Sequence, residues 1–425
     1  MSTHTLSVVG LGYVGLTTAL LAARAGYKVT GVDTNAERLA MVAAGRTPFS
    51  EHEPALEALC AELVRDGKLT VSKKVVAADY VFVAVPTPVQ EDGQPDTTAL
   101  VSALRAVAAA AANLQLLSVE STLAPGTMQA LVAPLFERAA STVIHAPERV
   151  MPGKLVHNAT TLARVLGVES DAAWQLASEI YTRIYGAPLR RCNWVNAELT
   201  KTAENAWRDV NIAFANTLAL ACEAAGGDFD IVRERVNESP GRQVLKAGVG
   251  VGGACLPKDT HLLAAVLPSD GYLRAARSTN ERMPAHAAAL IEQAAGGSLR
   301  GKRVLILGAS YLENVGDIAH SPALALATLL RGAGAAVEQH DPHLAAFDGD
   351  VYQQATGCDL IALATDHDAY TMLDWRQLRQ RAAANAAFVD LRSSILLDAA
   401  MREGFRVRRL GRGASFSPAE QPISQ

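Results

Sequence analysis

The sequence predicts an α/β protein with two Rossmann-like, doubly wound parallel-sheet domains, joined by a long central helix and a helical dimerisation domain. Three observations lead to this prediction. A glycine-rich turn lies between two apolar strand patterns near the N-terminus, residues 197–225 contain no proline or glycine, and a second series of strand and helix patterns begins near residue 301. Strands that alternate with helices are typical of parallel sheets whose faces are covered by helices.

Length and composition limit the possible functions. A chain of 425 residues, 49% of them hydrophobic, is long enough for about three domains, which we expect at residues 1–193, 194–297 and 298–425. The net charge of −4 argues against nucleic acid or an anionic membrane held by bulk charge. Five cysteines without CxxC spacing indicate a reducing compartment. Since neither a secretory signal nor a membrane-length apolar run is visible, we expect a cytoplasmic protein.

The first domain opens with a strand, a glycine turn, a helix and a second strand. Residues 6–9 and 28–32 have strand patterns, and the turn between them reads Gly10-Leu-Gly12-Tyr-Val-Gly15. Such a turn places backbone N–H groups and a helix N-terminus against a pyrophosphate. Asp33, which follows the second strand, can accept hydrogen bonds from both ribose hydroxyls and disfavours a 2′-phosphate. We therefore expect NAD, and a glycine turn without a cofactor is the alternative.

Polar residues follow three further strand patterns at residues 79–85, 116–119 and 143–145. Ligands of open α/β sheets bind beyond the carboxyl ends of strands, so Thr122 and Glu148 are candidates for one crevice. Each alone could instead be a capping or surface residue. The residues expected to bind NAD are Gly10, Gly12, Tyr13, Val14, Gly15, Asp33, Arg38, Pro86, Thr87, Ser121 and Thr122.

A helix of roughly 40 Å is predicted over residues 197–225, ending at Gly226. Lys201, Asn205 and Arg208 lie on one face of it, at positions i, i+4 and i+7. A solvated stripe is the alternative, but a polar stripe on a mostly apolar helix favours a ligand or a partner, and we expect a buried hinge or a dimer interface. The apolar residues include Ile212, Phe214, Leu218 and Leu220.

Residues 248–259 read GVGVGGACLPKD and carry one thiol, that of Cys255. The glycines can adopt positive φ and approach a ligand closely. Lys258 and Asp259 follow at once, so a cation and a carboxylate can adjust the thiolate fraction and handle protons. The segment favours a reactive thiol, and an ordinary glycine turn with a core cysteine is the alternative.

A second Rossmann-like domain is predicted after residue 298. Strand patterns occur at residues 304–307, 336–339, 360–364 and 388–390. Its first turn, Gly308-Ala-Ser310, lacks the GxGxxG pattern, so we expect it to hold a nucleotide rather than a dinucleotide. His340 and His343 have no third ligand nearby in the sequence, and we expect no metal site.

The order of these segments resembles the UDP-glucose/GDP-mannose dehydrogenases, NAD-dependent enzymes that oxidise the C6 alcohol of a nucleotide sugar to a carboxylate in two steps. The resemblance covers nearly the whole chain and depends on GLGYVGL, VAVPTP, EST, PGT, APER, the AELTKTAENAWRDVNIAFAN helix and GVGGACLPKD. It implies that Cys255 is the nucleophile, that Arg242 reaches the site of a dimer partner, and that further residues surround the reacting carbon. These are Lys201, Asn205, Asp259, Thr122 and Glu148. The residues implied in substrate binding are Glu148, Arg149, Val150, Lys201, Asn205, Arg208, Arg242, Gly250, Gly252 and Cys255.

Within this family, residues 120–122, 147–153 and 208–216 are most similar to UDP-N-acetyl-D-mannosamine dehydrogenases, and Pro152 stands where glucose-specific relatives often carry an acid. The third domain departs from the family, with Leu312 at the position of a usual lysine and Ala319 at that of a usual arginine. The implied reaction is a four-electron oxidation of a UDP-N-acetylhexosamine through a thiohemiacetal and a thioester, for cell-surface polysaccharide precursors.

Three alternatives remain open at this point. One is a UDP-glucose or GDP-mannose 6-dehydrogenase, and the second is a single-step dehydrogenase of the 6-phosphogluconate or β-hydroxyacid kind, which would need no thiol. The third is a non-catalytic nucleotide-sugar sensor that kept the fold. The number of NADH formed per sugar consumed distinguishes them.

Overall fold

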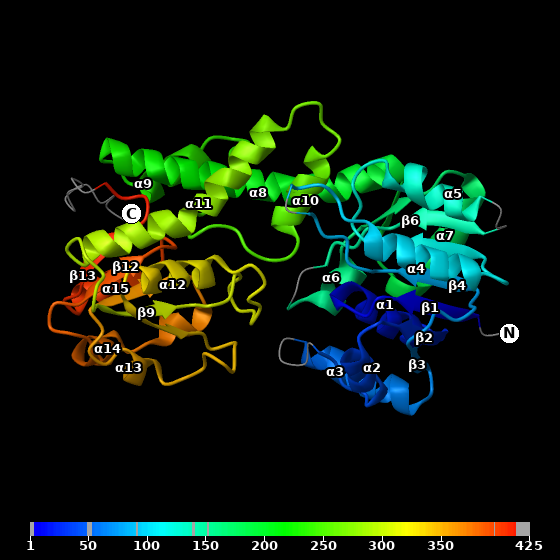
Figure 1. The fold of residues 1–425 in the computed structure, drawn as a ribbon, viewed down its shortest axis with the longest axis horizontal. Coiled ribbons are helices and arrows are strands. Elements are labelled where there is room, and N and C mark those ends of the chain that lie inside the picture. Colours follow the sequence, from blue (N-terminus) through cyan, green and yellow to red (C-terminus); the bar gives the residue numbers. More distant parts are fainter. Residues whose placement is uncertain are drawn as a thin grey trace. The chain divides into compact units, whose positions relative to one another are not determined.

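The computed structural model describes residues 4–48, 53–90, 92–137, 141–150, 153–394 and 396–413. The chain divides into two compact units (Figure 1). Unit 1 comprises Met1–Asn205 and Lys258–Asp270, and unit 2 comprises Ala206–Pro257 and Gly271–Gln425. Two helices, α8 (Trp194–Ala225) and α10 (Leu256–Ala264), therefore contribute residues to both units.

Unit 1 contains an eight-stranded sheet with the order β3-β2-β1-β4-β5-β6-β7-β8. Its strands are β1 (Thr5–Val9), β2 (Lys28–Val32), β3 (Leu69–Ser72), β4 (Tyr80–Val83), β5 (Leu116–Val119), β6 (Thr142–His145), β7 (Arg164–Gly167) and β8 (Leu189–Cys192). Strands β1–β6 pair in parallel, as predicted. The sequence did not predict that β7 pairs antiparallel to β6, with β8 parallel to β7. The paired residues are the last of each strand, His145 and Gly167, so β7 begins beyond the carboxyl end of β6.

Helices cover both faces of this sheet, which explains why its central strands are mostly apolar. Leu6, Val8 and Phe82 pack on one face with α1 (Tyr13–Arg24), α3 (Pro54–Arg65), α6 (Leu155–Thr161) and α7 (Asp171–Tyr185). Val81 and Val83 pack on the other face with α4 (Thr98–Ala109), the π-helical turn η1 (Met128–Val132) and α5 (Ala133–Phe136). The short helix α2 (Ala36–Ala43) follows β2 and is capped by the Asn35 side chain.

Unit 2 contains a parallel five-stranded sheet with the order β10-β9-β11-β12-β13. Its strands are β9 (Arg303–Leu307), β10 (Ala336–His340), β11 (Leu360–Leu363), β12 (Ala387–Asp390) and β13 (Arg406–Arg409). Val304 and Ile306 face α11 (Gly271–Ala294) and α12 (Pro322–Gly332), whereas Leu305 and Leu307 face the opposite layer. That layer contains α13 (Val351–Gln354), α14 (Trp375–Arg381) and α15 (Leu396–Arg402), next to the 3₁₀ turn η2 (Asp368–Met372).

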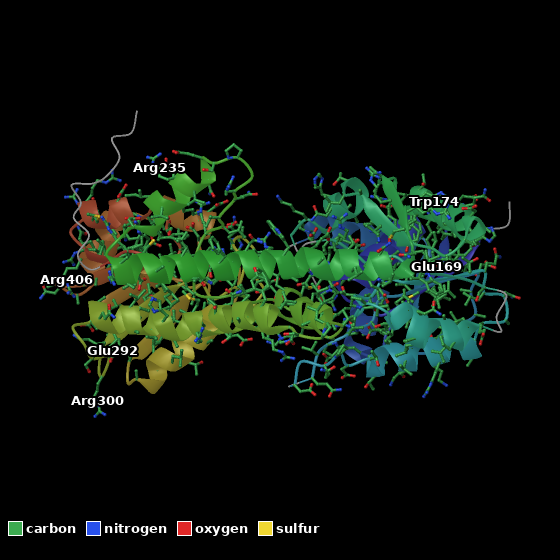
Figure 2. The ribbon with its side chains drawn as sticks, turned by 90° about the horizontal axis from the view of Figure 1, so that it is seen from above. Glu169, Trp174, Arg235, Glu292, Arg300 and Arg406 are labelled. Atoms are coloured by element: carbon green, nitrogen blue, oxygen red, sulfur yellow. The ribbon has the colours of Figure 1, made fainter. Side chains whose placement is uncertain are left out.

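The helical segment of unit 2 contains the second half of α8, α9 (Phe229–Asn237) and α11. Helix α8 begins three residues earlier than predicted, at Trp194, and ends at Ala225 as predicted. Within unit 2, α8 and α11 lie side by side (Figure 2), joined by a hydrogen bond of 2.9 Å between Glu223 and His286. Within the described ranges, no helix is both long and apolar enough to cross a membrane.

Candidate active site

The glycine turn after β1 has the shape that a bound pyrophosphate requires. Gly10 has φ +93° and its N–H donates to Val32 O at 2.8 Å. A Cβ at Gly15 would lie 1.8 Å from Gly10 O, so only glycine lets α1 approach the strand this closely. A Cβ at Gly12 would meet nothing within 4 Å, which leaves open space in front of the helix N-terminus, whose first turn contains Tyr13 and Val14. The turn therefore fits a dinucleotide diphosphate.

Asp33 lies at the carboxyl end of β2, as predicted, with its carboxylate at the glycine turn. Oδ2 accepts from Leu11 N at 2.8 Å and from Arg38 Nη1 at 2.9 Å, and Oδ1 accepts from Asn35 N at 2.8 Å. Burial alone would raise the pKa of Asp33, but hydrogen bonds from Asn35, Leu11 and Arg38 outweigh it and lower the pKa. The carboxylate is therefore ionised and able to accept hydrogen bonds from ribose hydroxyls.

Two side chains tie the ends of β4 and β5 together. The Thr87 hydroxyl donates to Thr122 O at 2.6 Å, and the Ser121 hydroxyl donates to Val85 O at 2.7 Å. The segment that contains Pro86 and Thr87 and the segment that contains Ser121 and Thr122 are thus brought together at one edge of the sheet. This is the edge that carries the glycine turn, because β1, β4 and β5 are parallel.

Glu148, Arg149 and Val150 form a turn whose polar groups bond within the protein. Glu148 Oε2 accepts from Arg164 Nη1 at 2.6 Å, and Oε1 accepts from the N–H groups of Arg149 at 2.7 Å and Val150 at 3.1 Å. The Arg149 guanidinium donates to Glu204 and to Ala163 O. These bonds give Glu148 and Arg149 an evident role in shaping the turn. Pro152, on which the substrate prediction partly depends, lies outside the described residues.

Arg164 is a central residue that sequence reasoning missed. It lies between Glu148 and Glu120, whose carboxylate it approaches at 3.5 Å, and over the ring of Tyr185 at 3.8 Å. Glu120 also accepts from the hydroxyl of Tyr181 at 2.7 Å. Burial, partly opposed by Arg164 and reinforced by the charge of Glu148, raises the pKa of Glu120 to about 6. No local pattern marks this cluster, because its members come from separate strands and helices.

Lys201 and Asn205 lie one turn apart on α8 and form a polar face of this helix in unit 1. Asn205 Nδ2 donates to Asp259 Oδ2 at 2.5 Å, and Lys258 Nζ lies 2.5 Å from Asp259 Oδ1, with Asp259 fully buried. Lys201, one turn before Asn205, is 8% exposed and has no hydrogen-bond or ion-pair partner among the residues that the structure describes. The ammonium group of Lys201 is therefore not engaged by a described residue and is available to an anion or to a developing negative charge.

Cys255 is exposed and directly precedes α10, the helix that carries Lys258 and Asp259. A helix N-terminus stabilises negative charge and thereby favours a thiolate. The thiol follows a glycine loop, residues 248–253, that belongs to unit 2. The loop packs closely on its surroundings, and Gly250 also lines a cavity in unit 2. A Cβ at Gly250, which has φ +130°, would lie 2.8 Å from Asn280 O, and a Cβ at Gly252 would lie 2.6 Å from Tyr311 Cβ.

A small cavity in unit 2 contains two guanidinium groups, those of Arg208 and Arg392. Leu312 and Glu313 also line it, so the loop that departs from the family pattern does face a candidate ligand site. Arg392 was missed from the sequence, although its place two residues after β12 is a strand-end signal. Arg242 lies on an exposed loop and donates to Pro240 O at 2.7 Å.

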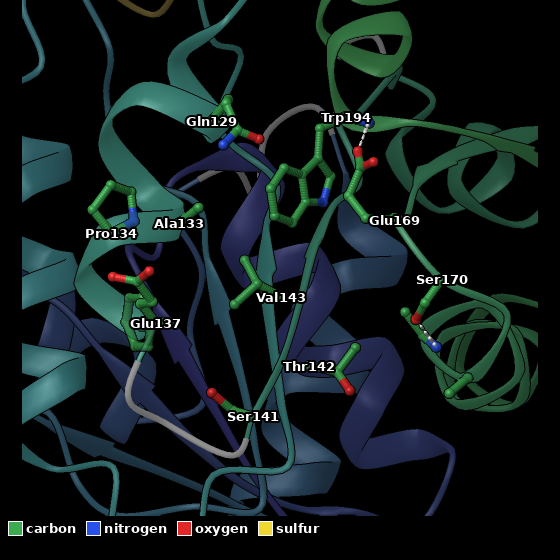
Figure 3. A pocket seen from close by; sticks show the side chains of 13 residues that line it. Gln129, Ala133, Pro134, Glu137, Ser141, Thr142, Val143, Glu169, Ser170 and Trp194 are labelled. Atoms are coloured by element: carbon green, nitrogen blue, oxygen red, sulfur yellow. Dashed lines mark hydrogen bonds between the residues drawn. The ribbon is translucent and has the colours of Figure 1, made fainter.

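Unit 1 also contains a hollow of about 500 Å³ beside β6 (Figure 3). The residues that Figure 3 labels include Gln129, Pro134, Glu137, Thr142, Val143, Glu169, Ser170 and Trp194. Thr142 is the first residue of β6, and β6 runs parallel to β5, so the hollow lies at the amino edge of these strands. The glycine turn lies beyond the carboxyl end of β1, at the opposite edge. Size alone therefore does not identify the dinucleotide site.

Comparison with known families assigns nearly the whole chain. Residues 4–185 match the NAD binding domain of the UDP-glucose/GDP-mannose dehydrogenase family, residues 195–282 match its central domain, and residues 305–396 match its UDP binding domain.

Individual relatives are similar over their full length. A UDP-N-acetyl-D-mannosamine dehydrogenase from Pyrococcus horikoshii is 33% identical over 96% of this chain and 99% of its own. UDP-glucose 6-dehydrogenase TuaD from Bacillus subtilis is 29% identical over 96% of this chain and 93% of its own. A solved structure of the P. horikoshii UDP-D-ManNAc dehydrogenase matches with a TM-score of 0.86 and 31% identity, over 96% of this chain and 99% of that one.

Proposed function

Since the chain belongs to the UDP-glucose/GDP-mannose dehydrogenase family, we propose that it oxidises the C6 alcohol of a UDP-N-acetylhexosamine, UDP-N-acetylmannosamine first, to the uronic acid. It is an NAD-dependent nucleotide-sugar dehydrogenase. The observation that carries the proposed thiol chemistry is the exposed Cys255 at the start of α10, whose buried Asp259 bonds to Asn205 and Lys258.

When bound, NAD accepts a hydride from C6 in each of the two oxidation steps. In the first step, the C6 hydroxyl loses its proton to a base while its carbon loses a hydride, which gives an aldehyde. Lys201, or a water molecule held by Asp259 and Asn205, is the candidate base. If Lys201 is the base it must be neutral, whereas as an oxyanion stabiliser it must be charged. The proposal leaves these two roles as alternatives for Lys201.

In the second step, the Cys255 thiolate attacks the aldehyde carbon, and the carbonyl oxygen takes a proton to form a thiohemiacetal. Loss of a hydride from the same carbon and of the hydroxyl proton gives a thioester. Water then cleaves the carbon–sulfur bond, which releases the carboxylate and returns the thiol. Positive or N–H groups such as those of Lys201 and Asn205 stabilise the oxyanions along this path. The overall change consumes one water and two NAD⁺ and yields two NADH and three protons.

The substrate proposal is supported by the similarity to UDP-N-acetylmannosamine enzymes and by the two guanidinium groups of the unit 2 cavity. Guanidinium groups bind phosphates bidentately, which suits a nucleoside diphosphate. The runner-up is oxidation of UDP-glucose, favoured by the similarity to TuaD. Values of kcat/KM for UDP-N-acetylmannosamine, UDP-N-acetylglucosamine, UDP-glucose and GDP-mannose decide between them. A clear preference for UDP-glucose or GDP-mannose would contradict the proposed substrate and leave the four-electron reaction in place.

The proposal includes a homodimer that forms along α8. In unit 2, Trp207 and Phe214 are each 56% exposed and lie two turns apart on the same face of the helix. Large exposed apolar side chains on one helix face indicate a protein interface. If Arg242 serves the neighbouring subunit, Arg242→Ala lowers activity while light scattering still gives the mass of a dimer. A fully active monomer would refute this arrangement.

A further inference from the structure

A chain of buried polar side chains in unit 2 joins α8 and α11 to the glycine loop. Asp209 and Asn216 come from α8, and Arg277 and Asn280 come from α11. None of the four is more than 4% exposed. Neither the glycine-turn cofactor site nor the unit 2 cavity uses any of them.

The hydrogen bonds in this chain converge on the Asp209 carboxylate, which accepts directly from Arg277 and, through the two asparagines, ends a series of donors that starts at the loop. Arg277 Nη1 donates to Asp209 Oδ1 at 2.6 Å, and Asn280 Nδ2 donates to the same oxygen at 2.8 Å. Asn280 Oδ1 accepts from Asn216 Nδ2 at 2.9 Å. Asn216 Oδ1 accepts from Gly248 N at 2.9 Å, which places the last bond on the backbone of the loop.

The same two asparagines restrict the loop at two points. Asn216 fixes the N–H of Gly248, and the backbone carbonyl of Asn280 lies where a Cβ of Gly250 would be, 2.8 Å away. Further along, Gly253 N donates to Ala319 O at 2.8 Å. These three contacts restrict the backbone path that leads into Cys255, the residue directly before α10.

Packing of two helices does not require this arrangement. When both partners of a buried amide hydrogen bond are replaced by apolar groups of the same shape, the change in stability is nearly neutral or favourable. When only one partner is replaced, the other is left unsatisfied and costs its full desolvation penalty. Leucine would fill the volume of Asn216 between α8 and α11, but it could not accept from Gly248 N. The amide oxygen of Asn216 is therefore explained by the loop and not by the helix contact.

We propose that Asn216 and Asn280 are positioning residues that fix the path of the glycine loop and thereby the orientation of the Cys255 thiol relative to the first turn of α10. The proposal rests on the proposed role of Cys255 in aldehyde oxidation. Asp209 and Arg277 act one step further away, by fixing the amide of Asn280.

The test uses Asn216→Leu in the full-length protein and two readouts. The first is the pH profile of Cys255 alkylation by iodoacetamide, followed by peptide mass spectrometry. Because the thiol is already exposed, a changed loop path turns it away from the N–H groups of the first turn of α10 and lowers the alkylation rate at pH 7 by about 3- to 5-fold. The second is the number of NADH formed per sugar, which falls from two toward one as aldehyde is released, while the first oxidation keeps its rate within about 3-fold.

A matched control is His286→Leu, which removes another polar contact between α8 and α11, that of Glu223 and His286, without touching the loop. It should leave both readouts at the wild-type values. If Asn216→Leu folds poorly at the assay temperature, alkylation is compared at a lower temperature at which circular dichroism shows the variant to be folded, and its rate should still be below that of wild type.

An unchanged alkylation profile together with two NADH per sugar in a folded Asn216→Leu variant would overturn the positioning role. A wild-type protein that forms one NADH per sugar would instead contradict the proposed function. The alkylation profiles would still show whether the asparagines place the thiol, so the two failures are distinguishable.

Discussion

The two sheets of this protein begin with the same hydrogen-bonded turn and then diverge. Gly10 and Gly308 have φ values of +93° and +96°, and each donates its N–H at 2.8 Å to the last residue of the neighbouring strand, Val32 or His340. The next N–H in each turn donates to the acid that follows that strand. Leu11 N lies 2.8 Å from Asp33 Oδ2, and Ala309 N lies 2.9 Å from Asp341 Oδ2.

Beyond these bonds, only the first turn keeps its acid available. Helix α1 begins directly after Gly12, whereas α12 begins at Pro322, after a loop formed by residues 309–321. Asp341 is fully buried and accepts from the N–H and hydroxyl of Ser310 at 2.8 and 2.7 Å, with His367 Nε2 at 3.1 Å. These bonds lower the pKa of Asp341 far below its usual range, although burial alone would raise it. We propose that the first acid binds a ribose, whereas the second holds a loop.

The largest effect on stability is expected from Asp341→Ala. It leaves Ala309 N and Ser310 N without their buried acceptor and should lower the free energy of unfolding by about 3–5 kcal/mol. Because Asp341 belongs to unit 2, NAD affinity should not change in the folded fraction. Thermal denaturation measures the loss of stability, and NAD titration measures the affinity. A loss of NAD affinity at constant stability would contradict the different roles assigned to the two turns.

The second effect is on cofactor binding. Asp33→Ala removes the acceptor for the ribose hydroxyls and should weaken NAD by about 100-fold, as measured by titration calorimetry. The N–H groups of Leu11 and Asn35 also lose an acceptor, so a smaller loss of thermal stability is expected with it. Unchanged NAD affinity would show that the first turn is not the dinucleotide site.

Each unit also buries a carboxyl group whose pKa burial raises to about 6, Glu120 in unit 1 and Asp390 in unit 2. A raised folded-state pKa stabilises the protonated form, so this contribution is complete below the unfolded pKa of Glu120, 4.5, and is lost as the pH rises through about 6. The stability of wild type relative to Glu120→Gln should therefore fall by about 2 kcal/mol over this range. Denaturant titrations from pH 4 to 7 measure it, and a difference that rises with pH would contradict the assignment.

The smallest effect tests the open side of the first turn. A Cβ at Gly12 meets nothing within 4 Å, whereas a Cβ at Gly308 would lie 2.4 Å from Thr365 Cβ. Gly12→Ala should leave the melting temperature unchanged and weaken NAD by about 10-fold, because the methyl group occupies the path of the diphosphate. Gly308→Ala should lower the melting temperature and leave NAD binding intact. The reverse pattern would mean that the second turn is the one that faces a ligand.

Much of this architecture could be predicted from local sequence. The strands at residues 28–32 and 116–119 have the predicted bounds, and the glycine turn, the long helix and the alternation of strands and helices in the second sheet's domain follow from periodicity and breakers. These features depend on short-range patterns. Asp33 was predictable because its distance from the glycine turn is set by one strand–helix–strand unit.

Features that depend on distant contacts were not predictable. Glu198 accepts from Gly126 N at 2.6 Å and Met128 N at 2.7 Å, and nothing in its surroundings on α8 indicates this. The role of Arg164 was not predictable for the same reason, since its carboxylate partners come from other strand ends. Asp341 resembles Asp33 in sequence position, and only the bonds to Ser310 and His367 show that its role differs.

The most direct test of the account is the number of NADH formed per UDP-N-acetylmannosamine consumed, compared between wild type and Cys255→Ala. Wild type should form two NADH and the uronic acid. Cys255→Ala should bind NAD with nearly the wild-type affinity and form no uronic acid, because the thiol belongs to a loop of unit 2 while the glycine turn belongs to unit 1. Two NADH per sugar at an unchanged rate in Cys255→Ala, or a single NADH in wild type, would contradict the thiol-dependent four-electron oxidation.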